Sequence, residues 1–161
     1  MRGINNPIKD VYIVKSDSGN LVNHTGDLIE TTLKSYTLPG GILGINGSLK
    51  FFACGSSFGN NGNKTYRLKF GATVIYTLIV GPGVPNLNWV MRSKCYNLGA
   101  ENNQNWSILG LDELAIDYNW ARFGSAEDTS VDKILSVTGQ LANVADTIRI
   151  GDWTVEIRPA S

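Results

Sequence analysis

The feature that most constrains this chain is the stretch from residue 64 to residue 80, KTYRLKFGATVIYTLIV. In its first half, large apolar side chains alternate with basic ones: Tyr66, Leu68 and Phe70 with Arg67 and Lys69. A period of two places these two sets on opposite faces of a β-strand. After Gly71, an apolar run rich in β-branched residues predicts a second strand. We therefore predict a hairpin that turns at Gly71, lies at the centre of the fold and gives its apolar face to the core.

Alternation of the same kind recurs along most of the chain. Near residue 51 the two faces of a predicted strand are Leu49, Phe51 and Ala53 on one side and Lys50 and Phe52 on the other. Near residue 91 they are Trp89, Met91 and Cys95 against Asn88, Arg92 and Lys94. A strand predicted at residues 114–120 and another at 153–158 place Trp120 and Trp153 on apolar faces. We expect Trp89, Trp120 and Trp153 to be core residues.

The predicted strands number about eight or nine, and turn signals rich in Gly, Asn and Pro recur about every 8–12 residues. One such turn, Gly151-Asp152, is expected to separate the last two strands. No window of helical length keeps apolar residues at i, i+3 and i+4. The pattern predicts an all-β chain with a single antiparallel β-sandwich over residues 27–161 and a short N-terminal arm over residues 1–26.

Charge excludes several kinds of partner. Fourteen Lys and Arg residues balance fourteen Asp and Glu residues, so the formal net charge is zero. The basic residues are scattered, which argues against binding to nucleic acid or to a membrane surface. No segment is apolar over the length of a bilayer, and the N-terminal residues lack the apolar region of a signal peptide. We therefore expect synthesis in the cytoplasm and no membrane partner.

The two cysteines and the single histidine do not form a metal site. Cys54 and Cys95 lie in apolar alternating segments, which favours two buried thiols, although a disulfide between neighbouring strands remains open. His24 lies in a polar stretch with no second histidine and no nucleophile motif, so we predict a solvated loop histidine. Together these residues offer no zinc spacing, and we predict no metal and no cofactor.

Carboxylates and aromatic side chains are the remaining candidates for function. Asp117 on an outward face could pair with a second acid as in a glycosidase, but outward carboxylates are also typical of a solvated sheet. We therefore expect no enzymatic activity. Tyr96 and Trp106 flank Asn-rich loops and are candidate glycan contacts, because aromatic rings stack on pyranose faces.

Two long segments carry a family resemblance: SYTLPGGILGINGSLKFFACGSSFGNNGNKTYRLKFGATVIY and SVTGQLANVADTIRIGDWTVEIRP. They resemble virion structural proteins of tailed bacteriophages. In those proteins a Pro-containing turn and an Asn-Gly turn precede a strand. An Asn-rich loop then leads to a strand that starts with Lys-Thr and ends with Phe-Gly. The similarity runs from about residue 28 to about residue 158 and includes the Trp89 strand.

The resemblance implies a jelly-roll-like β-sandwich that assembles as a homo-oligomer, commonly a homotrimer, and has no active site. A short arm without a long repetitive stalk fits a capsid decoration (cement) protein better than a whole fibre. The implied partners are copies of the same chain, the major capsid protein and other virion proteins, and the implied location is the capsid surface of the virion. Candidate subunit or capsid contacts lie in the arm: Ile4, Pro7, Ile8, Val11, Tyr12 and Ile13. The alternative function is a tail-fibre or lectin-like β-sandwich that binds a carbohydrate or receptor.

Overall fold

The computed structural model describes residues 12–112 and 119–160, with side chains for residues 15–110 and 122–160. Within these ranges the chain forms strands and loops and no helix. The eleven strands are β1 (Tyr12–Asp17), β2 (Val22–Thr25), β3 (Thr31–Leu38), β4 (Ser48–Phe58), β5 (Lys64–Phe70), β6 (Thr73–Val80), β7 (Asn86–Asn97), β8 (Gln104–Asp112), β9 (Asn119–Ser125), β10 (Lys133–Leu141) and β11 (Thr147–Arg158).

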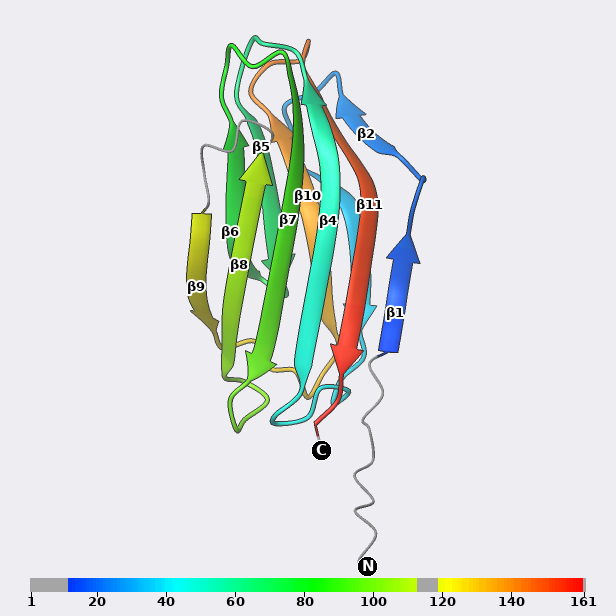
Figure 1. Ribbon diagram of the computed structural model, residues 1–161, viewed down its shortest axis with the longest axis vertical. Helices are drawn as coiled ribbons and strands as arrows, with labels where there is room; N and C mark the ends of the chain where they lie inside the picture. Colours follow the sequence, from blue (N-terminus) through cyan, green and yellow to red (C-terminus); the bar gives the residue numbers. More distant parts are fainter. Residues whose placement is uncertain (1–11, 113–118, 161) are drawn as a thin grey trace, which may run out of the picture.

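The strands form two antiparallel sheets that lie one in front of the other (Figure 1). The larger sheet has the order β1-β11-β4-β7-β8-β9, and β2 also pairs with β11. The smaller sheet has the order β3-β10-β5-β6. The predicted all-β class and antiparallel β-sandwich are therefore confirmed.

The strand order is that of a jelly roll. When β2 to β7 are lettered B to G, and β10 and β11 are lettered H and I, the larger sheet contains B-I-D-G and the smaller sheet reads C-H-E-F. Strands β8 and β9 are inserted between G and H and extend the larger sheet beyond G. This insertion widens the outer face of the larger sheet, where the candidate site lies.

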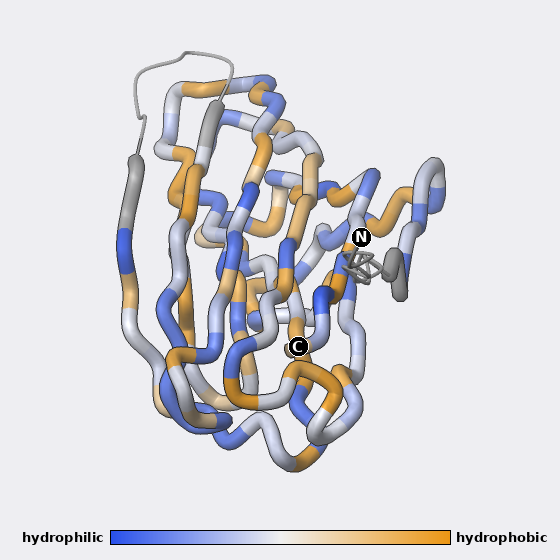
Figure 2. Tube along the Cα trace, turned by 60° about the horizontal axis from the view of Figure 1, so that its bottom comes forward, coloured by the Kyte–Doolittle hydropathy of each residue, from blue (hydrophilic) through white to orange (hydrophobic). Residues whose placement is uncertain are grey.

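Apolar side chains from both sheets are buried in the core between them. Along the strands, hydrophilic and hydrophobic residues alternate (Figure 2). Trp89 and Trp153 are each 1% exposed, as predicted. The side chain of Trp120 and the strand predicted at residues 114–120 lie largely outside the described residues. The core is therefore an aromatic and aliphatic layer shared by two sheets.

The hairpin predicted at Gly71 is confirmed as β5 and β6, with Tyr66, Leu68 and Phe70 fully buried. Its tyrosine and phenylalanine join the two sheets: the Tyr66 ring lies 4.4 Å from Trp89 and the Phe70 ring 5.2 Å from Trp106. Gly71 has φ +58°, which favours glycine. We predicted that the hairpin lies at the centre of the fold. Only β5 is an inner strand of its sheet, because β6 is an edge strand.

Strand β11 departs from the prediction of two strands and a turn. Residues 147–158 form one strand, and the register to β4 shifts between Ile150 and Trp153. The expected turn at Gly151-Asp152 is thus wrong, because these residues form an irregularity that interrupts pairing without ending the strand.

The described part of the predicted arm also contributes strands. Both β1 and β2 pair with β11 of the same chain. These two short strands raise the total above the eight or nine expected. The division of the chain at residue 26 stays a prediction.

Candidate binding groove on the larger sheet

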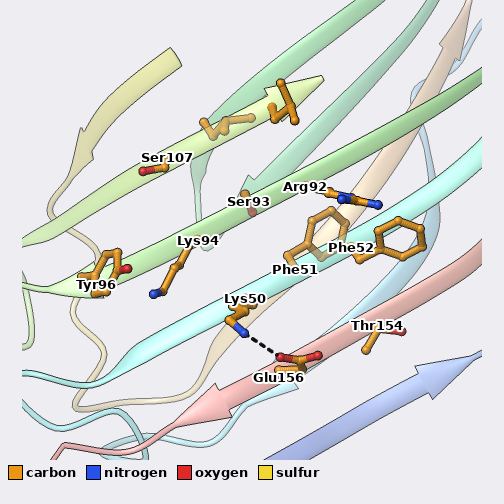
Figure 3. A pocket seen from close by; sticks show the side chains of 12 residues that line it. Lys50, Phe51, Phe52, Arg92, Ser93, Lys94, Tyr96, Ser107, Thr154 and Glu156 are labelled. Atoms are coloured by element: carbon orange, nitrogen blue, oxygen red, sulfur yellow. Dashed lines mark hydrogen bonds and ion pairs between the residues drawn. The ribbon is translucent and has the colours of Figure 1, made fainter. Parts of the chain in front are cut away.

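A groove of about 660 Å³ crosses the outer face of the larger sheet. We call it the outer groove (Figure 3). Four strands, β11, β4, β7 and β8, contribute its lining: Lys50, Phe51, Phe52, Arg92, Ser93, Lys94, Tyr96, Ser107, Ile108, Leu109, Thr154 and Glu156. Phe51, Ser93 and Ile108 are themselves buried, at 2%, 6% and 1% exposed, so the sheet backbone forms the floor.

The register of the strands arranges the other lining side chains in rows across the sheet. One row reads Glu156, Lys50, Lys94 and Ser107 from β11 to β8. The next row reads Thr154, Phe52, Arg92 and Leu109. Residues directly opposite each other in an antiparallel pair share a face and have neighbouring Cβ atoms. Charged, aromatic and hydroxyl groups from four strands therefore converge on one surface.

Two of the three cations in the outer groove lie against aromatic rings. The Arg92 guanidinium lies 5.5 Å from the centre of the Phe52 ring, and the Lys94 ammonium lies 4.3 Å from that of Tyr96. Such contacts hold a cation in place without neutralising it. The third cation, Lys50, forms an ion pair with Glu156 at 3.3 Å.

Arg92 and Lys94 form no ion pair with any residue in the described ranges. The smaller sheet differs, because the cations near it are paired with carboxylates: Lys34 with Asp17, Arg67 and Lys69 with Glu30, and Lys133 with Glu127. The outer groove therefore carries positive charge that no carboxylate in the described ranges balances through an ion pair.

Tyr96, one of the two predicted glycan contacts, lines the outer groove and is 38% exposed. The other, Trp106, is 0% exposed, so its predicted role as a glycan contact is wrong. It lies on the inner face of β8, where its Nε1 donates a hydrogen bond to Ser125 Oγ at 3.0 Å and its ring packs on Phe70. Its neighbour Ser107 has the opposite parity and reaches the outer groove.

The predicted subunit contacts lie mostly beyond the part of the chain that the structure describes, which excludes Ile4, Pro7, Ile8 and Val11. The backbones of Tyr12 and Ile13 belong to β1, opposite Ile157 and Glu156 of β11. Contacts of these residues with another chain stay a prediction. Asp117, the candidate glycosidase carboxylate, also lies outside the described residues.

His24 is not the solvated loop residue that we predicted. It lies in β2 opposite Ile148 and is 5% exposed, with Nε2 3.6 Å from Asp27 Oδ1. The sequence around it looks polar, but residues 22–25 pair with β11 as a strand, and in that strand the His24 side chain is buried.

Both cysteines are free thiols. Cys95 is buried as predicted, and burial raises its pKa well above the usual range. Cys54 is only half-buried, because it lies on the outer face of β4, and burial together with Asp152 raises the pKa of its thiol. High pKa values leave these thiols protonated near neutral pH.

Across the described ranges, no group of three or more His, Cys, Asp or Glu side chains is placed to hold a metal ion. No helix suited to crossing a bilayer occurs in those same ranges.

Among the groove residues that the sequence did not reveal are Lys50, Phe52, Arg92 and Lys94. The sequence places each of them on the strand face opposite the more apolar set. The missing information was the strand order, which makes β4 and β7 neighbours and brings the four side chains together.

Comparisons with known proteins identify no family for this chain. No protein-family model matches the sequence, and no curated protein is significantly similar to it. Among solved structures, arcelin-5, a lectin-like defense protein from Phaseolus vulgaris, is similar over 94% of this chain and 99% of its own, at 5% identity and a TM-score of 0.46. Dimeric latent PorU from Porphyromonas gingivalis is similar over 91% of this chain but only 13% of its own, at 10% identity and a TM-score of 0.40.

Proposed function

We propose that this chain is a non-enzymatic carbohydrate-binding β-sandwich that takes a saccharide in the outer groove. The observation that carries the proposal is the grouping of Tyr96 and Phe52 with polar side chains on one open surface. Pyranose rings have faces rich in C–H bonds that pack on aromatic rings, and their hydroxyl groups need hydrogen-bond partners at the rim.

The size and chemistry of the outer groove suit such a ligand. Its volume of about 660 Å³ falls within the range of roughly 300–1,000 Å³ that is usual for small-molecule sites. Ser107 and Thr154 supply hydroxyl groups, and Lys50 with Glu156 supplies both a donor and an acceptor. A shallow surface with a floor of sheet backbone suits an extended oligosaccharide better than a compact ligand that must be enclosed.

A glycan array probed with the labelled full chain tests this proposal. We expect binding to a subset of oligosaccharides, and we expect Tyr96→Ala and Phe52→Ala each to weaken it at least about tenfold, because each removes an aromatic contact surface. Phe58→Ala is the matched control, since Phe58 also belongs to β4 but lies outside the outer groove, beneath Arg149. Absence of binding to every saccharide, or equal losses in all three variants, would refute the proposal.

A second candidate function is a capsid decoration (cement) protein of a phage virion, a homotrimer that binds the major capsid protein. The resemblance to virion proteins favours it, and so do the exposed side chains of Val74 and Ile79 on edge strand β6, at 40% and 57% exposed. Apolar side chains beside an unpaired strand edge are suited to contact with another subunit. A monomer by light scattering that also fails to bind capsids lacking this protein would exclude this function.

A further inference from the structure

We propose that the outer groove selects an acidic saccharide, one that carries a carboxylate, over its neutral counterpart. This inference rests on the proposed carbohydrate-binding function and adds the charge of the ligand to it. It starts from the two unbalanced cations, Arg92 and Lys94, beside the aromatic rings of the outer groove.

The first row of the groove places like charges directly opposite each other. Lys50 on β4 faces Lys94 on β7, and like charges in this position destabilise a sheet. Glu156 neutralises only Lys50, because its carboxylate contacts Lys50 from the other side, on β11. The same row ends with Arg122 on β9, opposite Ser107. Within this row, one carboxylate is thus set against three cations, Lys50, Lys94 and Arg122.

The second row adds a cation with a specific hydrogen-bonding geometry. Arg92 lies directly opposite Phe52, and its guanidinium is over that ring. A guanidinium presents several N–H donors in a rigid plane, and it binds a carboxylate through two parallel hydrogen bonds. A sugar ring stacked near Phe52 or Tyr96 would therefore bring a ring carboxylate within reach of Arg92 or Lys94.

The positive charge of the outer groove is local, because the whole chain has a formal net charge of zero. On the smaller sheet, by contrast, Glu30 pairs with both Arg67 and Lys69, and Glu127 pairs with Lys133. A neutral saccharide would leave the charges of Lys94 and Arg92 unbalanced. A carboxylate on the ligand would supply the missing partner, which is why we favour an acidic saccharide over a neutral one.

Isothermal titration calorimetry with paired probes tests the inference. The first pair is hexagalacturonate and its fully methyl-esterified form, and the second pair is 3′-sialyllactose and lactose. We expect at least one acidic probe to bind about tenfold more tightly than its neutral counterpart, the scale of one charge-assisted hydrogen bond. Added NaCl should weaken that binding, because the interacting charges are exposed to solvent.

Arg92→Gln and Lys94→Gln should each reduce affinity for the acidic probe by about tenfold and leave affinity for its neutral counterpart nearly unchanged. Lys15→Gln is the matched control, since it removes an exposed cation of β1 outside the outer groove. Equal affinity for acidic and neutral probes, or equal losses in the Arg92 and Lys15 variants, would overturn the inference and leave the carbohydrate-binding function standing.

Binding of no saccharide at all, on the array or in solution, would instead refute the carbohydrate-binding function and the inference with it. Sedimentation velocity without saccharide tests whether a second copy of the chain occupies the groove instead. If the chain self-associates and Arg92→Gln abolishes that association, the groove is an interface between copies, and the inference is wrong.

Discussion

Breaking the buried ion pair between Lys64 and Asp146 should destabilise the sandwich more than almost any other single polar change. Both side chains are 0% exposed, and the two charged groups lie 3.9 Å apart at the loop that leads into β5. The Asp146 carboxylate also accepts hydrogen bonds from the backbone N–H groups of Asn61 and Gly62, at 3.2 and 2.8 Å. The pair therefore holds the loop between β4 and β5 against the loop that precedes β11.

The expected magnitude follows from this geometry. In Asp146→Ala, Lys64 would remain buried without an opposite charge, which costs about 3–5 kcal/mol in the free energy of unfolding. The double variant Asp146→Ala/Lys64→Met removes both charges, so it should be more stable than the sum of the two single changes predicts by about 1–3 kcal/mol. Urea denaturation followed by tryptophan fluorescence measures each of these free energies.

Glu156→Ala is the control for this experiment. It breaks the ion pair with Lys50, whose side chain is 56% exposed, and should cost less than about 1 kcal/mol. A cost for Asp146→Ala as small as that of Glu156→Ala, or simple additivity in the double variant, would show that the loops do not depend on the buried pair.

Three further outcomes are expected. Trp106→Ala should lower the free energy of unfolding by about 3–5 kcal/mol in urea denaturation, because it empties a core position; a loss below about 1 kcal/mol would contradict its burial. Gly71→Ala should cost about 1–3 kcal/mol in thermal or urea unfolding, because φ is +58° and the added Cβ would lie 2.2 Å from Glu127 Oε2; an unchanged midpoint would contradict the assigned turn. Burial works to raise the pKa of Asp146, but hydrogen bonds and the Lys64 charge outweigh it and hold that pKa below its usual range. A carboxyl whose pKa is lowered by folding stabilises the fold above its unfolded pKa of about 3.9, and this contribution is lost as the pH falls through the folded pKa. The free energy of unfolding, measured against pH, should therefore fall on acidification. The fall should be smaller in Asp146→Asn.

The sequence predicts the inner faces of the long strands well, because the buried side chains follow an alternation of apolar and polar residues that is visible in the local sequence. Tyr66, Leu68, Phe70 and Trp153 all lie where that period places them. Prediction fails where an element depends on a distant partner. Strand β2 and the burial of His24 exist only because β11 offers an edge, and Gly151 resembles a turn residue although β11 continues through it.

The candidate site was only half predictable for the same reason. The sequence singles out Tyr96 because an aromatic residue beside an Asn-rich loop is visible in it; the structure places Tyr96 in the outer groove, and its contact with a glycan stays a prediction. Trp106 was misassigned, because nearness to the Asn-rich loop was given more weight than its position on the inner face. Arg92 and Lys94 could be placed on an outward face, but their meeting with Phe52 depends on the pairing of β4 with β7.

Saccharide binding in the outer groove is the proposed property that most needs a direct test. Its most direct test is an NMR titration of the ¹⁵N-labelled chain with hexagalacturonate and 3′-sialyllactose, with amide shifts assigned along every strand. We predict that shift changes concentrate on β4, β7, β8 and β11 around Tyr96 and Arg92. Changes confined to the smaller sheet, or no changes with either saccharide, would contradict this proposal.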